Sequence, residues 1–269
     1  MSKKKLLIVT QDMEPYSALS QIANIANELP LYFQDNGMEL RILMPKFGTI
    51  NERRHRLHEV VRLSGMNIIV DDDDYPLIIK VASLPNSRLQ VYFLDNDDFF
   101  KRKSVFTDAD GIPFEDNPDR LVFFCKGVIE TVKKFGWSPD IVHCLGWMTS
   151  LVPLYLKTAY VDDPVFKNSK VIYSLYDQEI PKLDKEKLLT KASINNLSHD
   201  EISSIFDEND VIIESAAIKY SDGLILGNET LPDDVSKLIA DSGKKTLQLP
   251  AEDYLAALKS FYQDVMDAS

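Results

Sequence analysis

The sequence predicts an α/β protein with a single Rossmann-like domain, built on a doubly wound, mostly parallel sheet that carries one β-hairpin excursion. Three observations indicate this fold. Apolar runs typical of strands buried on both faces alternate with segments of helical periodicity. The first three elements read as a βαβ unit. No internal repeat or low-complexity tract interrupts the alternation over the 269 residues.

The βαβ unit begins at the amino terminus. The run KLLIVT at residues 5–10 is continuously apolar and contains β-branched residues, so we expect a buried strand. After the loop DMEPYS, apolar residues recur at helical spacing as far as Leu29, and Asn36-Gly37 supplies the stop signal. Residues 40–44 form the next strand. This order predicts the opening of a doubly wound fold.

The following segment, from Arg56 to Asp95, has a different pattern. Short strand-like runs are separated by SG, DDDDYP and PNS, and no helical segment lies between them. We therefore expect an antiparallel hairpin excursion that returns to the sheet at residues 91–94. Asn117 then caps a helix that has Pro118 at its first position and ends near Gly136.

In the rest of the chain, strand-like and helix-like segments alternate again. We expect strand 140–144, helix 147–158, strand 171–175, a polar helical region at 181–209, helix 211–220, strand 223–226 and helix 233–240. The last segment, 250–266, places its apolar residues on one helical face. We therefore divide the chain into a Rossmann-like domain at residues 1–249 and a carboxyl-terminal amphipathic helix at residues 250–269 that packs back on it.

Composition excludes several classes of partner. The net charge of −12 repels phosphate backbones and anionic membranes over most of the surface, so we expect neither nucleic acid nor a membrane as a partner. No apolar run has the length of a membrane span, and LLIV is too short for a signal peptide. The two cysteines, Cys125 and Cys144, cannot form a disulfide framework. We expect a cytoplasmic protein.

Four long blocks resemble the bacterial glycogen synthases and plant starch synthases. They are ELPLYFQDNGMELRILMPKFG at 28–48, VYFLDNDDFF at 91–100, GIPFEDNPDRLVFFCKGVIE at 111–130 and GWSPDIVHCLGWMTSLVPLYLK at 136–157. The resemblance implies a GT-B glycosyltransferase, in which two Rossmann-like domains face each other and glucose passes from ADP-glucose or UDP-glucose to an α-1,4-glucan. We expect this chain to be equivalent to the amino-terminal half of that arrangement and to lack the second, nucleotide-binding domain.

The first family motif, Glu-x-x-Pro-Phe-x-Lys-Thr-Gly-Gly-Leu, is altered here. Its glycines let backbone amides approach a diphosphate, and its lysine neutralises the charge. Asp12, Pro15 and Tyr16 keep its first part. The lysine, threonine and two glycines are replaced, in order, by Ala18, Leu19, Ser20 and Gln21. We therefore expect this loop not to bind a diphosphate.

Two further family motifs are also altered. His-x-His-Asp-Trp-x-Thr lines the sugar site in the family, and this chain keeps His143, Trp147 and Thr149 but has Leu145 and Gly146 at the second histidine and the aspartate. Thr-Ile-His-Asn aligns with SLYD, which places Tyr176 at the histidine and Asp177 at the asparagine.

These motifs define the candidate site. We assign no catalytic residue and no cofactor. We also assign no metal ligand, because the aspartates at 71–74 read as a solvated loop. The candidate ligand-binding cleft consists of Asp12, Tyr16, Gln21, His143, Trp147, Thr149, Tyr176 and Asp177. For His143 the competing interpretation is a partly buried histidine bonded to backbone, and for Trp147 it is packing between helix and sheet. Asp177 and Glu179 resemble a glycosidase pair only if they converge in space.

Two functions compete at this stage. The first is a noncatalytic, pseudoenzyme descendant that serves as a glucan-binding, regulatory or scaffold protein, alone, as a homodimer or with a protein partner. The alternative is an active glucosyltransferase subunit that uses ADP-glucose or UDP-glucose and is completed by a separate nucleotide-binding partner. The replaced lysine, glycines and histidines favour the first. A nicotinamide-binding Rossmann protein is set aside, because no GxGxxG follows the first strand.

Overall fold

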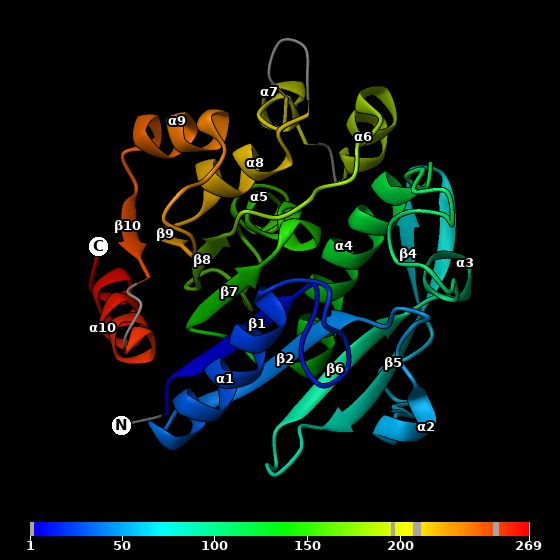
Figure 1. The fold of residues 1–269 in the computed structure, drawn as a ribbon, viewed down its shortest axis with the longest axis horizontal. Helices are drawn as coiled ribbons and strands as arrows, with labels where there is room; N and C mark the ends of the chain where they lie inside the picture. Colours follow the sequence, from blue (N-terminus) through cyan, green and yellow to red (C-terminus); the bar gives the residue numbers. More distant parts are fainter. Residues whose placement is uncertain (1–2, 195–196, 207–210, 250–252, 269) are drawn as a thin grey trace.

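The fold is taken from a computed structural model that describes residues 3–194, 197–206, 211–249 and 253–268. Ten strands in this part of the chain form one sheet, with β4 paired to β5 outside the main path (Figure 1). The strands are β1 Lys5–Thr10, β2 Glu39–Pro45, β3 His58–Glu59, β4 Met66–Val70, β5 Asp73–Ser83, β6 Gln90–Asp95, β7 Ile141–Leu145, β8 Lys170–Leu175, β9 Gly223–Leu226 and β10 Lys245–Gln248.

The sheet has the order β10-β9-β8-β7-β1-β2-β6-β5-β3. All pairings from β10 to β6 are parallel, whereas β5 is antiparallel to β6, β4 and β3. The predicted doubly wound, mostly parallel sheet with a hairpin excursion is therefore confirmed. The central strands β1 and β7 are buried along almost their whole length, which explains their largely apolar sequences.

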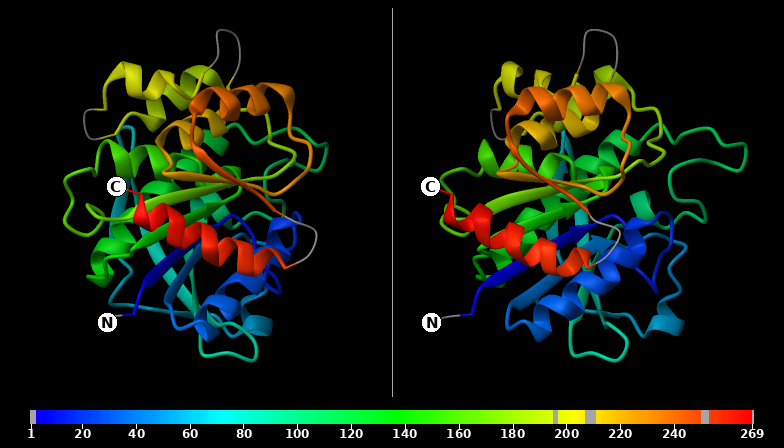
Figure 2. Two further views of the ribbon diagram at one scale, coloured as in Figure 1. Left: turned by 90° about the vertical axis from the view of Figure 1, so that its left-hand side faces the viewer. Right: turned by 60° about the vertical axis from the view of Figure 1, so that its left-hand side comes forward.

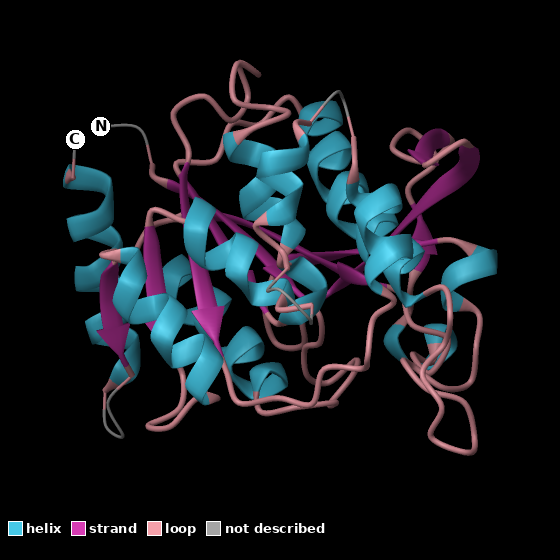
Figure 3. Cartoon of the chain, turned by 90° about the horizontal axis from the view of Figure 1, so that it is seen from above, coloured by secondary structure: helices cyan, strands magenta, loops and turns pink. Residues whose placement is uncertain are grey.

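Helices cover both faces of this sheet (Figure 3). They are α1 Ile22–Asp35, α2 Glu52–His55, α3 Asp97–Phe100, α4 Asn117–Phe135, the 3₁₀ helix η1 Trp147–Thr149, α5 Leu151–Lys157, α6 Lys185–Ala192, α7 His199–Ser203, α8 Ile213–Tyr220, α9 Asp233–Ser242 and α10 Tyr254–Asp267. None of these described helices is both long enough and apolar enough to cross a bilayer.

The carboxyl-terminal helix α10 lies beside α1, although the two are far apart in sequence (Figure 2). The rings of Phe33 and Tyr262 stack with centroids 4.7 Å apart, and the Lys259 ammonium donates to the Asn36 side chain at 2.7 Å. The buried face of α10 consists of Leu258, Phe261, Tyr262 and Val265. The contact with Phe33 places α10 over the same face of the sheet as α1, where Tyr262 meets His143 of β7 and Phe261 lies against Gly223 of β9.

Several element boundaries differ from the sequence interpretation. The helix expected at 147–158 is divided into η1 and α5, because the turn at Gly146 leads into a tight 3₁₀ turn before the α-helix begins. The short edge strand β10 was not predicted, and its four residues are mostly exposed, so they carry no strand-like apolar pattern. The predicted limits at residues 209 and 250 lie outside the described residues.

Candidate functional site

The candidate site lies at the carboxyl edge of the sheet, where the winding direction reverses. β1 is flanked by β2 and β7. The chain leaves β1 through α1 toward β2, and it leaves β7 through α5 toward β8. Because the loops after β1 and β7 diverge, this edge is the usual ligand position of an open α/β sheet.

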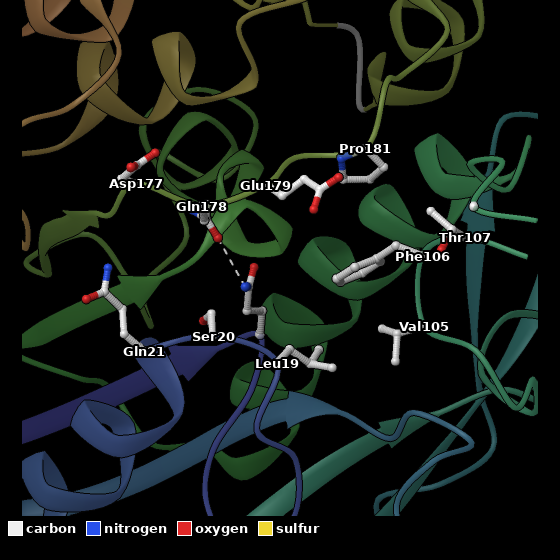
Figure 4. Close-up of a pocket in the computed structure, with 12 residues that line it drawn as sticks. Leu19, Ser20, Gln21, Val105, Phe106, Thr107, Asp177, Gln178, Glu179 and Pro181 are labelled. Carbon is white, nitrogen blue, oxygen red and sulfur yellow. Dashed lines mark hydrogen bonds between the residues drawn. The ribbon is translucent and has the colours of Figure 1, made fainter.

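A cavity of about 700 Å³ lies at this edge, and we call it the carboxyl-edge cavity (Figure 4). Its lining residues are Gln11, Leu19, Ser20, Gln21, Val105, Phe106, Thr107, Gly111, Asp177, Gln178, Glu179 and Pro181. Gln21 and Asp177 lie on one side, and Val105 and Phe106 lie on the other. The lining carries three amide side chains, two hydroxyls and two carboxylates. Among the described residues that line it there is no lysine, arginine or histidine.

Amide side chains connect the floor of this cavity to a buried acid. Gln11 Nε2 donates to Gln178 Oε1 at 3.1 Å, and Gln178 Nε2 donates to Glu214 Oε1 at 3.5 Å. Burial raises the pKa of Glu214 to about 7, and the hydrogen bond from Gln178 opposes this shift. The lining residue Gln178 is therefore bonded to an acid outside the cavity that is partly protonated near neutral pH.

Gly146 allows Gln11 to take this position. Its φ of 89° lies in the left-handed region, and a Cβ on its backbone would approach the Gln11 side chain to 2.4 Å. The Gly146 carbonyl accepts hydrogen bonds from Thr149 Oγ1 at 2.7 Å and from the Tyr173 hydroxyl at 3.3 Å. The replacement noted in the second family motif thus makes room for the Gln11 amide, directly after the first strand.

Asn228 joins two of the predicted site residues. Its Oδ1 accepts from Gln21 Nε2 at 2.8 Å and from the backbone amide of Asp177 at 2.9 Å. Gln21 and Asp177 are both exposed and line the carboxyl-edge cavity. The loops after β1, β8 and β9 are therefore tied together on this side of the cavity.

The Asp12 carboxylate occupies the backbone donors of the loop before α1. Its Oδ2 accepts from the amides of Leu19 at 2.8 Å and Ser20 at 2.9 Å. Asp12 is fully buried, and burial raises the pKa of its carboxyl to about 6, although these amides lower it. Two amides that could meet a phosphate are thus already bonded to a carboxylate of the same chain.

His143 is sealed inside the protein. Its Nε2 lies 2.6 Å from Ser174 Oγ, and its Nδ1 lies 2.5 Å from the Tyr262 hydroxyl of α10. Burial lowers the pKa of His143 to about 3, so the imidazole is neutral at physiological pH. Its partners are two hydroxyls rather than the backbone that the competing interpretation assumed.

The other four predicted residues are also buried and do not line the cavity. The Tyr16 hydroxyl donates to the Ser83 carbonyl at 3.0 Å, so the side chain points toward β5. Trp147 packs on Phe106 with centroids 4.8 Å apart. The remaining two are Thr149, bonded to Gly146, and Tyr176, which lies against Gly227.

The structure thus brings Gln21 and Asp177 to the cavity and places the other six beneath it or away from it. Sequence reasoning missed Gln11, Gln178 and Asn228. Gln11 directly follows the end of β1, and the other two lie within three residues of the ends of β8 and β9, which is the signal that could have found them. Asp177 and Glu179 both line the cavity. Among the described residues no group of three or more histidine, cysteine, aspartate or glutamate side chains could hold a metal ion.

Comparisons with known proteins give a consistent result. The family model for the starch synthase catalytic domain matches residues 5–244. Glycogen synthase from Pelodictyon phaeoclathratiforme is 38% identical over 209 residues, which are 75% of this chain and 43% of that protein. Glycogen synthase from Chlorobium phaeobacteroides is 36% identical over 234 residues, 84% of this chain and 48% of that protein. The chain therefore spans less than half the length of these relatives.

A solved structure shares the fold. The catalytic domain of starch synthase IV from Arabidopsis thaliana, bound to ADP and acarbose, matches with a TM-score of 0.72 and 16% sequence identity. The match covers 92% of this chain and 51% of that chain. The predicted correspondence to one half of a GT-B catalytic domain is confirmed.

Proposed function

Because this chain belongs to the starch synthase catalytic domain family, we propose that it is a glycogen synthase-like protein that binds α-glucan at the carboxyl-edge cavity and does not transfer glucose by itself. The role that fits is glucan binding in a regulatory or scaffold capacity. In this proposal residues 1–249 form the Rossmann-like domain, and α10 is a helix that packs on its surface.

The charge of the carboxyl-edge cavity carries this proposal. Glucosyl transfer from a nucleotide sugar releases a diphosphate, and stabilising its charge normally requires positioned cationic donors. The described lining residues offer two carboxylates, Asp177 and Glu179, and no cation. A diphosphate in this position would meet repulsion in place of stabilisation.

The bonding of nearby groups supports the same conclusion. The amides of Leu19 and Ser20 donate to Asp12, so they are not free to donate to a phosphate. His143 is neutral, buried and bonded to Ser174 and Tyr262. Neither group can reach a ligand in the cavity unless its own hydrogen bonds break.

A neutral saccharide suits the lining better. Sugar hydroxyls both donate and accept, so they pair with the amides of Gln11, Gln21 and Gln178 and with the two carboxylates. Phe106 supplies an apolar surface for a sugar ring on the opposite side. An uncharged ligand also avoids the electrostatic cost that a diphosphate would face.

Calorimetric titration with maltoheptaose, ADP and ADP-glucose tests the proposal. We expect maltoheptaose to bind and the two nucleotides to bind far more weakly at this cavity. The double variant Gln21→Ala and Asp177→Ala removes one amide and one carboxylate from it, and we expect about tenfold weaker maltoheptaose binding.

The matched control is Gln263→Ala with Asp267→Ala, which removes the same two groups from the exposed face of α10. We expect this control to bind maltoheptaose as the unchanged protein does. Incorporation of labelled glucose from ADP-glucose or UDP-glucose into glycogen by the purified chain at about 1 s⁻¹ or faster would overturn the noncatalytic assignment. Equal loss of maltoheptaose binding in both double variants would show that the glucan does not bind at the carboxyl-edge cavity.

A further inference from the structure

A second cavity, of about 630 Å³, lies at the opposite edge of the sheet, where β1, β2 and β6 begin. We call it the amino-edge cavity. Four basic residues line it, namely Lys3, Arg41, Arg62 and Arg88, and the one acidic residue among its lining is Glu39. This concentration of positive charge contrasts with the net charge of −12 for the whole chain.

The four cations have no carboxylate partners within the described part of the chain. None of them forms an ion pair there, although ten other lysine and arginine side chains do. Glu39 is engaged elsewhere, because its Oε1 accepts from the Trp137 indole at 2.6 Å. Like charges held around one cavity repel each other, and an anion between them would relieve that repulsion.

Arg41 is held rigidly at this cavity. Its guanidinium carbon lies 4.3 Å from the centroid of the Phe135 ring and 5.1 Å from that of Trp137. One terminal nitrogen contacts the Tyr92 hydroxyl at 3.4 Å, and the buried Nε has no hydrogen-bond partner among the described residues. A planar guanidinium that is fixed by stacking is suited to an oxyanion, which would meet its terminal nitrogens.

We propose that the amino-edge cavity binds a small molecule through a phosphate or diphosphate group, with Arg41 as the fixed donor and Arg62 and Arg88 as exposed cations that close on the anion. The net charge of −12 disfavours a long polyanion such as nucleic acid, which would extend beyond the cavity. The site is separate from the carboxyl-edge cavity and does not depend on glucan binding there.

Isothermal titration with inorganic pyrophosphate and with glucose 1-phosphate tests this assignment and distinguishes a free inorganic anion from a phosphosugar. We expect 1:1 binding of at least one of them. The double variant Arg62→Gln and Arg88→Gln removes two exposed guanidinium groups, and we expect roughly hundredfold weaker binding, about tenfold for each group.

The control is Arg53→Gln with Arg54→Gln, which removes the same charge from exposed positions on α2 that do not line the cavity. We expect it to bind the anion within about threefold of the unchanged protein. Equal weakening in both double variants would show unspecific attraction and overturn the site. The same conclusion would follow from no binding at about 5 mM ligand, or from tighter binding of a single-stranded oligonucleotide than of either probe.

Discussion

The carboxyl-edge and amino-edge cavities are similar in volume and lie at opposite ends of the same strands, yet their charges are opposite. The first has two carboxylates and no cation among its described lining residues, and the second has four cations and one engaged carboxylate. In a GT-B fold the carboxyl edge is where a nucleotide sugar would be expected. The difference teaches that the cations suited to an anion lie at the amino edge of the sheet. The carboxyl edge, where a nucleotide sugar is expected, has none among its described lining residues.

Charge reversal at the amino edge has the largest expected effect on this comparison. Arg62→Glu with Arg88→Glu places two carboxylates where two guanidinium groups lie, so a phosphate would meet repulsion from both. We expect roughly a thousandfold or greater loss of pyrophosphate affinity by isothermal titration. Maltoheptaose binding should stay unchanged, and a parallel loss of both ligands would contradict two separate sites.

The next largest effect concerns the buried acid bonded to Gln178, which lines the carboxyl-edge cavity. Burial raises the pKa of Glu214 to about 7 from an ordinary value of 4.5, so the folded chain holds this proton more tightly than the unfolded chain. The free energy of unfolding therefore decreases as the pH rises from 4.5 to 7, because the unfolded chain releases the Glu214 proton before the folded chain does. Glu214→Gln removes the loss, and at about pH 8 we expect its free energy of unfolding to exceed that of the unchanged protein by about 3 kcal/mol.

Urea unfolding at about pH 4.5 and pH 8 measures this difference, which should nearly vanish at the lower pH. The raised pKa of Asp12 and the lowered pKa of His143 also change stability with pH, but both are present in the two proteins and cancel in the comparison. Glu229→Gln, at an exposed carboxylate, is the control. A constant difference at both pH values would show that Glu214 acts through packing rather than through its charge.

A smaller effect tests whether His143 belongs to the cavity or to the core. Tyr262→Phe removes the hydroxyl beside His143 Nδ1 and leaves a buried nitrogen without a partner, which costs about 2 kcal/mol of unfolding free energy. Tyr254→Phe removes a hydroxyl from the same helix where it contacts Glu28 near the surface, and we expect a smaller loss. If Tyr262→Phe weakened maltoheptaose binding without lowering stability, His143 would be a ligand-binding residue.

The smallest predicted effect introduces a cation at the carboxyl edge. Gln21→Lys adds an ammonium to a cavity that has two carboxylates, so the gain in pyrophosphate affinity there should be at most about tenfold. The measurement is made in the Arg62→Glu and Arg88→Glu background, so that the amino-edge cavity does not contribute. A larger gain would indicate that the lack of a cation is by itself the reason why the carboxyl-edge cavity binds pyrophosphate more weakly than the amino-edge cavity.

Local sequence patterns predicted most of the fold, for a physical reason. A strand buried on both faces, such as residues 5–10, must be apolar throughout, and a helix such as α4 must repeat its apolar residues at helical spacing. The exposed strand β10 meets neither condition and was missed. The hairpin at β5 was found because turn residues separate its strands.

The same patterns predicted only part of the candidate site. Gln21 and Asp177 were identified from motif positions, and both line the carboxyl-edge cavity. His143 was named for the same reason, but Tyr262 is 119 residues away and seals it from solvent. Gln11 enters the cavity because Gly146 has no side chain, a contact that depends on the pairing of β1 with β7.

By itself, the sequence determined the order of the main strands and helices, the family, and the absence of a lysine and glycines from the loop after β1. Only the tertiary structure decided which polar groups share a cavity, because sheet pairing joins residues that are distant in sequence. Lys3, Arg41 and Arg88 meet through the adjacent starts of β1, β2 and β6, and Arg62 joins them from the turn between β3 and β4. No local pattern marks these four residues. Burial likewise depends on what packs above a residue. His143 is buried because Tyr262 of α10 packs on it, which the sequence of its own strand does not show.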